Sequence, residues 1–231
     1  LLVYSGFFVA GACALSLEIT APRVLATSYG STSILWAIVI SITLGSWAIG
    51  SYCASLVPTR KNHLATCLSF LFSAVLVSVV KPLLTLLPRI LPNQGLGCMV
   101  AVTTASLAGP ILCLGAVPVL LLHSLHENGP SVSPSRLVGP AYAIGTLGSI
   151  CGALLAAFIG MPLIGINLFL AAIVTSLLLY AGFFMRQPRA YALMPLVFLP
   201  HWSPDWARSA AILEHRESAY QSIRVVSFDA G

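Results

Sequence analysis

Two ionisable residues, Glu18 and Arg23, interrupt a long apolar segment near the start of the chain. In a segment that crosses a membrane, an ionisable side chain is costly and usually faces protein or a water-filled cavity. One interpretation is a polar site near the outer face of the membrane, where Glu18 binds a cationic ligand. The other is a structural pair, in which Pro22 kinks the helix end and lets Arg23 reach Glu18 or the lipid headgroups. We favour the structural pair, because ion pairs inside membranes also serve assembly.

A second candidate group combines two histidines with a carboxylate. His123, His126 and Glu127 have the i, i+3, i+4 spacing that places side chains on one face of a helix. These residue types bind zinc, but the sequence offers no clear further ligands to complete a site. Solvated side chains at a helix end are therefore favoured, and no metal is predicted. The six cysteines include no Cys-x-x-Cys pair, so no disulfide framework is expected either.

Small residues at regular spacing indicate close helix packing rather than catalysis. The segment Thr-Leu-Gly-Ser occurs at 43–46 and again at 146–149. Small residues four positions apart lie on one helix face and let a second helix approach closely. An inverted repeat of three plus three helices would explain why this segment occurs twice. A match of only four residues, all of common types, is more simply explained by coincidence. The predicted packing residues are Gly45, Ser46, Gly50, Gly148 and Gly152.

The composition decides which elements must position these residues. The chain has 231 residues, of which 58% are hydrophobic and only 7% are charged. Soluble domains carry about 25% charged residues, so a polytopic, all-α membrane bundle is the predicted class. The net charge of +5 is read as a topology signal and not as a nucleic-acid surface. No glycine-rich phosphate loop, nucleophile elbow or catalytic carboxylate pair is visible, so no catalytic residue is predicted.

Six segments have close to the ~20 residues that a bilayer requires. We expect the spans to be Val3–Ala26, Ile34–Val57, Leu64–Leu87, Val100–His123, Ala141–Ile159 and Ile166–Met185. Late in the third span, Lys81 is expected to extend its ammonium group to the interface.

The placement of Lys and Arg predicts the orientation. Arg60 with Lys61, Arg136, and Arg186 with Arg189 follow the second, fourth and sixth spans, whereas the opposite side holds Arg23 and Arg89. Because positive charge accumulates in cytoplasmic loops, both ends of the chain are predicted to be cytoplasmic.

The remainder of the chain is more polar. Residues 1–189 form the predicted membrane domain, and 190–213 an interfacial connector with a short helix that Ser203 and Pro204 begin and Leu213 ends. A seventh, kinked span is the weaker alternative, because Asp205 and Arg208 would lie within it.

Residues 214–231 show the alternation of a β-strand. Gln221, Ile223 and Val225 share one face, while Tyr220 and Arg224 lie on the other. A strand that begins just before the chain stops has no partner, so we expect it to be the first strand of a truncated soluble domain.

Several segments resemble a known family when taken together. Glu217–Val225, with its Ser-x-Tyr-Gln-x-Ile-x-Val pattern, resembles the entry strand of the spermidine synthase family, the polyamine aminopropyltransferases. The membrane part is similar to the multispan region of bacterial membrane-anchored members. The matching pieces are Phe7–Gly11, Leu17-Glu18 with Pro22–Ala26, Tyr29–Ser31 with Trp36, and Tyr142–Gly152.

This resemblance implies a β-domain followed by a Rossmann-like fold downstream. It implies transfer of an aminopropyl group from decarboxylated S-adenosylmethionine, the co-substrate, to putrescine. Gln221, with Tyr220 beside it, would bind substrate, Gln221 through the nucleoside. The acidic residues of such a site would lie downstream, so the chain alone lacks the catalytic core and holds no cofactor.

Further functions stay open at this point. A transporter-like module that binds or moves a polyamine or another small cation would use Glu18, although a polycation path should offer several carboxylates. A helper subunit without a ligand, and a homo-oligomer, would suit the small-residue faces. The expected setting is a multi-pass protein of the bacterial inner membrane, whose partners are the bilayer and the downstream domain.

Overall fold

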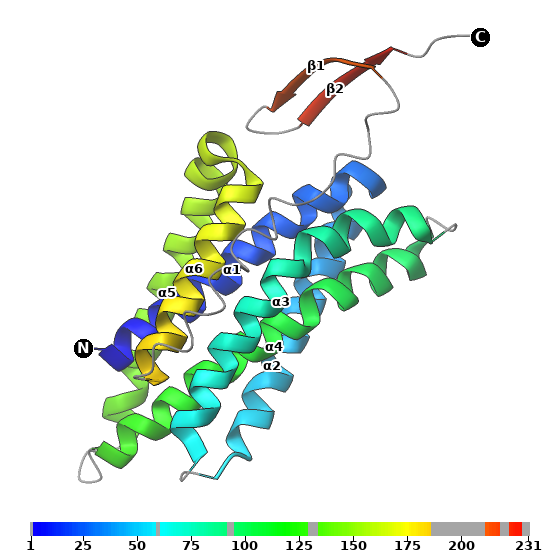
Figure 1. Ribbon diagram of the computed structural model, residues 1–231. Helices are drawn as coiled ribbons and strands as arrows, with labels where there is room; N and C mark the ends of the chain where they lie inside the picture. Colours follow the sequence, from blue (N-terminus) through cyan, green and yellow to red (C-terminus); the bar gives the residue numbers. More distant parts are fainter. Residues whose placement is uncertain are drawn as a thin grey trace.

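The computed structural model describes residues 2–58, 61–91, 95–128, 134–185, 211–217 and 222–227. Six helices form an elongated bundle (Figure 1). They are α1 (Leu2–Tyr29), α2 (Ser33–Ser55), α3 (Asn62–Ile90), α4 (Leu96–Asn128), α5 (Pro134–Leu154) and α6 (Ile166–Met185), and a π-helical stretch, η2 (Leu155–Ile164), continues α5.

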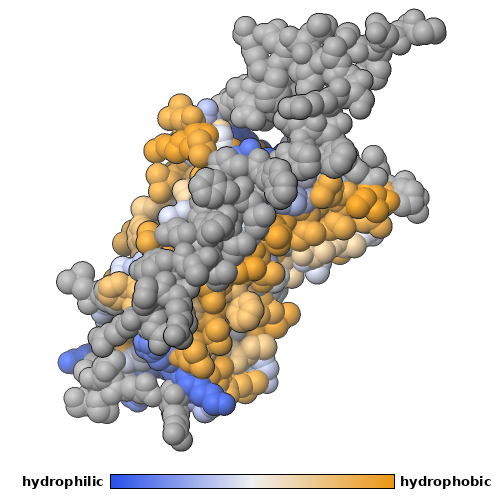
Figure 2. Space-filling view, viewed as in Figure 1, coloured by the Kyte–Doolittle hydropathy of each residue, from blue (hydrophilic) through white to orange (hydrophobic). Residues whose placement is uncertain are grey.

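All six helices are long and apolar enough to cross a membrane. The prediction of a helical membrane bundle is therefore confirmed, with six candidate spans among the described residues. Figure 2 shows apolar residues over most of the visible length of the bundle, with hydrophilic residues gathered mainly at its lower end. A belt of this kind is the surface that a bilayer requires.

The helices alternate in direction, which gives the bundle two distinct ends (Figure 1). α1 and α3 end at what we call the Tyr29 end, where α2, α4 and α6 begin. α2 and α4 finish at the opposite end, called the His126 end, which also holds the start of α1 and the last turn of α6. Six crossings therefore return the chain to the side on which α1 begins.

The interior of the bundle is apolar. Leu17 of α1, Phe70 of α3, Leu114 of α4 and Leu177 of α6 are all buried in one cluster. Lipid tails are as apolar as these side chains, so the hydrophobic effect does not drive the helices together. Close packing and interhelical hydrogen bonds must supply the stability.

Glycines bring α1 and α5 into direct backbone contact. A Cβ atom at Gly148 would collide with the carbonyl oxygen of Phe8, and one at Gly152 with that of Ala12. From the other side, a Cβ at Gly11 would collide with the Gly145 carbonyl oxygen. The structure therefore places Gly148 and Gly152 on the close helix contact that their spacing predicts.

A second contact of this kind joins α2 and α4. A Cβ at Gly50 would collide with the carbonyl oxygen of Leu112, and Ser46, one turn earlier, is buried on the same face. By contrast, the site of a Cβ at Gly45 has no atom within 4 Å, and Gly45 is exposed. The prediction that Gly45 packs against another helix is wrong, since Ser46 holds the position on α2 that Gly148 holds on α5.

Two strands follow the bundle. β1 (Ala211–Glu217) pairs antiparallel with β2 (Ser222–Ser227), with Glu217 opposite Ser222 and Ala211 opposite Ser227. The expected lone strand therefore has a partner, and the end of the expected connector helix, 211–213, is strand. Residues 190–210, Tyr220 and Gln221 lie outside the described residues, and no Rossmann-type domain is seen among those that are described.

The glycine contacts predict opposite effects for one chemical change at two sites. Gly148→Ala should destabilise the bundle by about 1–3 kcal/mol, because the new methyl group forces the α1 and α5 backbones apart. Gly45→Ala, in the same Thr-Leu-Gly-Ser context, should be neutral or stabilise by up to about 1 kcal/mol, since alanine favours a helix and meets open space. Unfolding in detergent measures both, and equal effects would contradict the assigned contacts.

Candidate functional site: polar groups inside the bundle

Glu18 is the one acidic residue in the spans whose side chain is described, and it contacts α2. The side chain is half-buried and lies near that of Thr43 on α2, which is itself 2% exposed. The Thr43 hydroxyl donates to the carbonyl oxygen of Ile40 at 3.0 Å. An ionised acidic side chain at a span centre costs about 2.5–3.5 kcal/mol.

Arg23 does not share the environment of Glu18. α1 continues through Pro22 as far as Tyr29, so the helix does not end at the kink predicted at Pro22. Residues five apart on an α-helix are separated by about 140° around the axis and about 7.5 Å along it. Among the described residues no ion pair joins Glu18 to Arg23, and the described residue near Glu18 on the next helix is Thr43.

A second intramembrane pair connects α3 and α6. The Lys81 ammonium donates a hydrogen bond to the side-chain oxygen of Asn167, in the first turn of α6. The backbone at Gly165 has φ +84°, a conformation that favours glycine, and it separates η2 from α6. Lys81 is therefore bonded to a neighbouring helix, and the extension of its ammonium group to the interface stays a prediction. Asn167, the lone amide at the start of the sixth span, is a residue that sequence reasoning missed.

A third polar group lies toward the His126 end. Asn62 is 1% exposed, and its amide nitrogen donates to the carbonyl oxygen of Leu120 at 2.9 Å and to the Ser124 hydroxyl at 3.3 Å. The Asn62 oxygen and Nδ1 of His123 are buried without a partner. Within the described part of the chain no three His, Cys, Asp or Glu side chains gather as metal ligands. The buried Nδ1 of His123 differs from the solvated side chain that the sequence predicts there.

Other hydroxyl groups also bond across helices. Ser16 donates to the Gly152 carbonyl oxygen at 3.0 Å, and Ser51 to that of Gly115 at 2.9 Å. Ser73 donates to the Pro110 carbonyl oxygen at 3.3 Å. Each bond fastens one helix to the backbone of another. These groups hold the bundle together and are not left free to line a path for a polar substrate.

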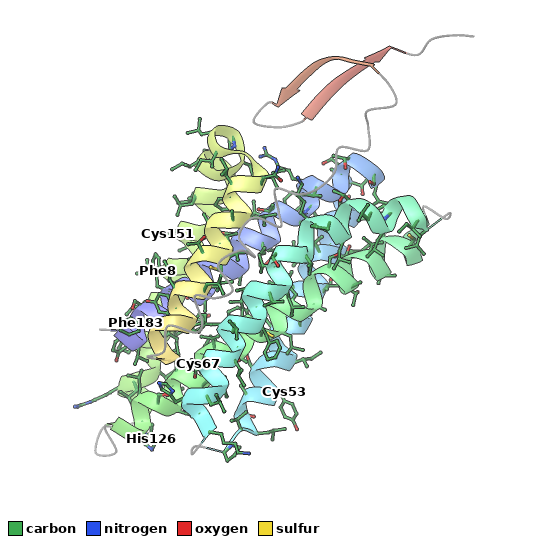
Figure 3. All side chains as sticks on the ribbon, in the orientation of Figure 1. Phe8, Cys53, Cys67, His126, Cys151 and Phe183 are labelled. Carbon is green, nitrogen blue, oxygen red and sulfur yellow. The ribbon has the colours of Figure 1, made fainter. Side chains whose placement is uncertain are left out.

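The cysteines do not form a common site. All six are free thiols, and Figure 3 shows Cys53, Cys67 and Cys151 well apart, on α2, α3 and α5. Two others make single contacts, Cys13 with the Ser176 hydroxyl at 3.4 Å and Cys98 with that of Tyr29 at 3.2 Å. This arrangement supports neither a metal site nor a disulfide.

Comparison of the chain with protein-family models, with curated proteins and with solved structures gives no match.

The Lys81–Asn167 bond predicts a coupled effect on stability. Asn167→Ala should cost about 1–3 kcal/mol, because it leaves a half-buried ammonium without this acceptor. Lys81→Met combined with Asn167→Ala should cost less than the two single changes added together. Thr175→Val is the control, since Thr175 bonds only within α6, to Ala171, at 2.7 Å. Unfolding in detergent measures the stability of the two single variants and the double variant. If the effects of the single changes add to that of the double change within about 0.5 kcal/mol, the pairing is contradicted.

Proposed function

We propose that this chain is the membrane-anchoring region of a spermidine synthase-like enzyme. The observation that carries the proposal is the order of its elements: a six-helix membrane bundle followed by a β-hairpin. The second strand of that hairpin, β2, begins one residue after Gln221, inside the segment that resembles the family's entry strand. The polar groups of the bundle support the same view, because helix–helix bonds engage them.

The chemistry of such an enzyme is a nucleophilic substitution. The amine of putrescine attacks the carbon next to the sulfonium of decarboxylated S-adenosylmethionine and releases methylthioadenosine. The reaction needs acidic groups that hold and deprotonate the diamine, in a site shielded from competing water. In this proposal those groups belong to a downstream domain, while the side-chain amide of Gln221 contacts the nucleoside and Tyr220 lies beside it. The bundle fixes that domain at the bilayer.

A transporter-like membrane module is the second candidate, and one observation favours it. α2 lies closely along α4 in the same direction, just as α1 lies along α5. If α1, α2 and α3 are matched with α4, α5 and α6, the α2–α4 pair corresponds to the α5–α1 pair. Inverted-repeat transporters show this relation between their two halves. The same matching makes the α3–α4 pair correspond to the α6–α1 pair, but α3 and α4 pack far more closely than α6 and α1 do. The two halves of the bundle therefore differ at this contact. A path for cations would need several acidic side chains, but the interior is apolar and Glu18 is the one acidic side chain described in the spans.

The proposed location is a bacterial inner membrane with both ends of the chain in the cytoplasm. α6 finishes at the His126 end, the end at which α1 begins (Figure 1). The side on which the hairpin is found therefore decides between the interfacial connector and a seventh span.

Thiol labelling in whole cells tests this topology. In a variant without native cysteines, Pro58→Cys in the loop after α2 and Ser218→Cys between the two strands should both react only after permeabilisation. That result corresponds to the proposed cytoplasmic placement of both ends. Labelling of the hairpin thiol alone from outside would show that 191–213 crosses the membrane. Labelling of the loop thiol from outside would overturn the orientation.

Calorimetry with methylthioadenosine tests the enzyme assignment. In the protein that includes the downstream domain, Gln221→Ala should weaken binding by about 1–3 kcal/mol, because a polar partner of the nucleoside is lost. Gln187→Ala, a matched change in the segment after α6, should leave the affinity unchanged. Residues 1–231 alone should not bind. Wild-type affinity in the Gln221 variant would remove it from the site, and tight binding by residues 1–231 would contradict the division into anchor and enzyme.

A further inference from the structure

Two buried polar atoms near the His126 end have no partner among the described residues. One is the side-chain oxygen of Asn62, at the start of α3, and the other is Nδ1 of His123, near the end of α4. Asn62 is 1% exposed, so bulk water does not reach its amide group. A buried polar atom without a hydrogen bond is strongly unfavourable, and native proteins contain few of them. Each of these two atoms therefore needs a partner.

The hydrogen bonds of Asn62 fix which of its two amide atoms is left over. Its nitrogen donates to the carbonyl oxygen of Leu120 at 2.9 Å and to the Ser124 hydroxyl at 3.3 Å. Exchanging the amide nitrogen and oxygen would bring the Asn62 oxygen against the carbonyl oxygen of Leu120, with no hydrogen between the two acceptors. The oxygen is therefore the atom of Asn62 that lacks a donor.

The same two bonds place the amide group of Asn62 beside His123. In an α-helix the carbonyl group of each residue points toward the residue four positions later. The Leu120 carbonyl oxygen accordingly also accepts a hydrogen bond from the Ser124 hydroxyl at 3.2 Å. An amide group bonded to both of these groups lies against the turn of α4 that contains His123. The two unpartnered atoms thus belong to one small region between α3 and α4.

A water molecule can satisfy both atoms at once. An amide oxygen only accepts hydrogen bonds, and a neutral imidazole ring has one nitrogen that accepts. We propose that Asn62 and His123 hold one ordered water molecule, which donates one hydrogen to the Asn62 oxygen and the other to Nδ1 of His123. The ring hydrogen of His123 then lies on Nε2. This water site belongs to the membrane bundle and does not depend on the proposed enzyme.

The position of the site in the bundle suits a water molecule. Asn62 is the first residue of α3, and α4 ends at Asn128, shortly after His123. Figure 3 labels His126, three residues after His123, at this end of α4. Water that enters from the headgroup layer therefore has only a short distance to cross. Buried water commonly bridges polar groups in this way, and here it adds a link between α3 and α4 to the two direct bonds of Asn62.

A crystal structure at a resolution that shows ordered water tests the site directly. We expect one density peak within about 3.2 Å of both the Asn62 oxygen and Nδ1 of His123. A direct contact between these two atoms would overturn the proposal. So would the lack of a peak where other buried water is visible, or a peak about 2.0–2.2 Å from Nδ1, which is the distance of a metal ion.

Two substitutions of His123 distinguish its two ring nitrogens. The amide atoms of asparagine are attached at the same position along the side chain as Nδ1, whereas those of glutamine lie one bond further out. His123→Asn should therefore keep the water and change the unfolding equilibrium constant in detergent less than about threefold, whereas His123→Gln should raise it about tenfold, the cost of one buried bond left unmade. Equal effects of the two substitutions would contradict the assignment of Nδ1.

The same substitutions in an Asn62→Ala background separate the water from general packing. With the Asn62 oxygen removed, the water loses one of its two partners, and the difference between His123→Asn and His123→Gln should disappear. The matched control is the pair His126→Asn and His126→Gln, because His126 is exposed on the same helix, and both should leave stability unchanged. A difference at His123 that is the same with and without Asn62 would overturn the proposal.

Discussion

The close approach of helix backbones at glycines is the contact on which the rest of this bundle depends. Inside a bilayer, apolar side chains gain little by leaving lipid for protein, so association relies on dispersion contacts and hydrogen bonds that act over short distances. Gly148 and Gly152 bring α5 against the carbonyl groups of α1, and Gly50 does the same for α2 and α4. Once the backbones are this close, a serine on one helix reaches a carbonyl oxygen on the next, as Ser16 does with Gly152.

The polar residues follow from the same constraint. A hydroxyl, an amide or an ammonium group in the apolar interior must find a partner, and the nearest one is the neighbouring helix. The side chain of Asn167 accepts a hydrogen bond from Lys81, the backbone of α4 accepts one from Asn62, and the backbone of α5 accepts one from Ser16. Polar groups that are bonded to a neighbouring helix are not free to bind a substrate that crosses the membrane. This argument supports the proposed anchor over a transporter.

The sequence predicts much of this fold, because bilayer thickness fixes the length of an apolar span. All six spans and the contact of Gly148 follow from apolar length and four-residue spacing. Which residues of a helix face its neighbour is harder to predict. The repeated Thr-Leu-Gly-Ser segment suggests that Gly45 packs against another helix, whereas the structure buries Ser46. The same problem affects Glu18 and Arg23, which are near in sequence but point to different sides of α1. Partners distant in sequence, such as Lys81 and Asn167, leave no local signal.

The end of the chain shows a different limit. The helix-start signal of Ser203 and Pro204 suggests a helix through Leu213, but 211–213 belong to β1. A strand is stabilised by its partner, so β1 is recognised only once β2 is known to pair with it. The described residues therefore contain a hairpin where the sequence predicts a lone strand.

The central claim is that the bundle anchors an enzyme and does not itself carry polyamines across the membrane. Purified protein that includes the downstream domain can be reconstituted in vesicles and given labelled putrescine with decarboxylated S-adenosylmethionine. With the domain facing outward, the account predicts that labelled spermidine forms outside and that no label accumulates inside beyond that in protein-free vesicles. Saturable accumulation of putrescine inside the vesicles, without formation of spermidine, would contradict it.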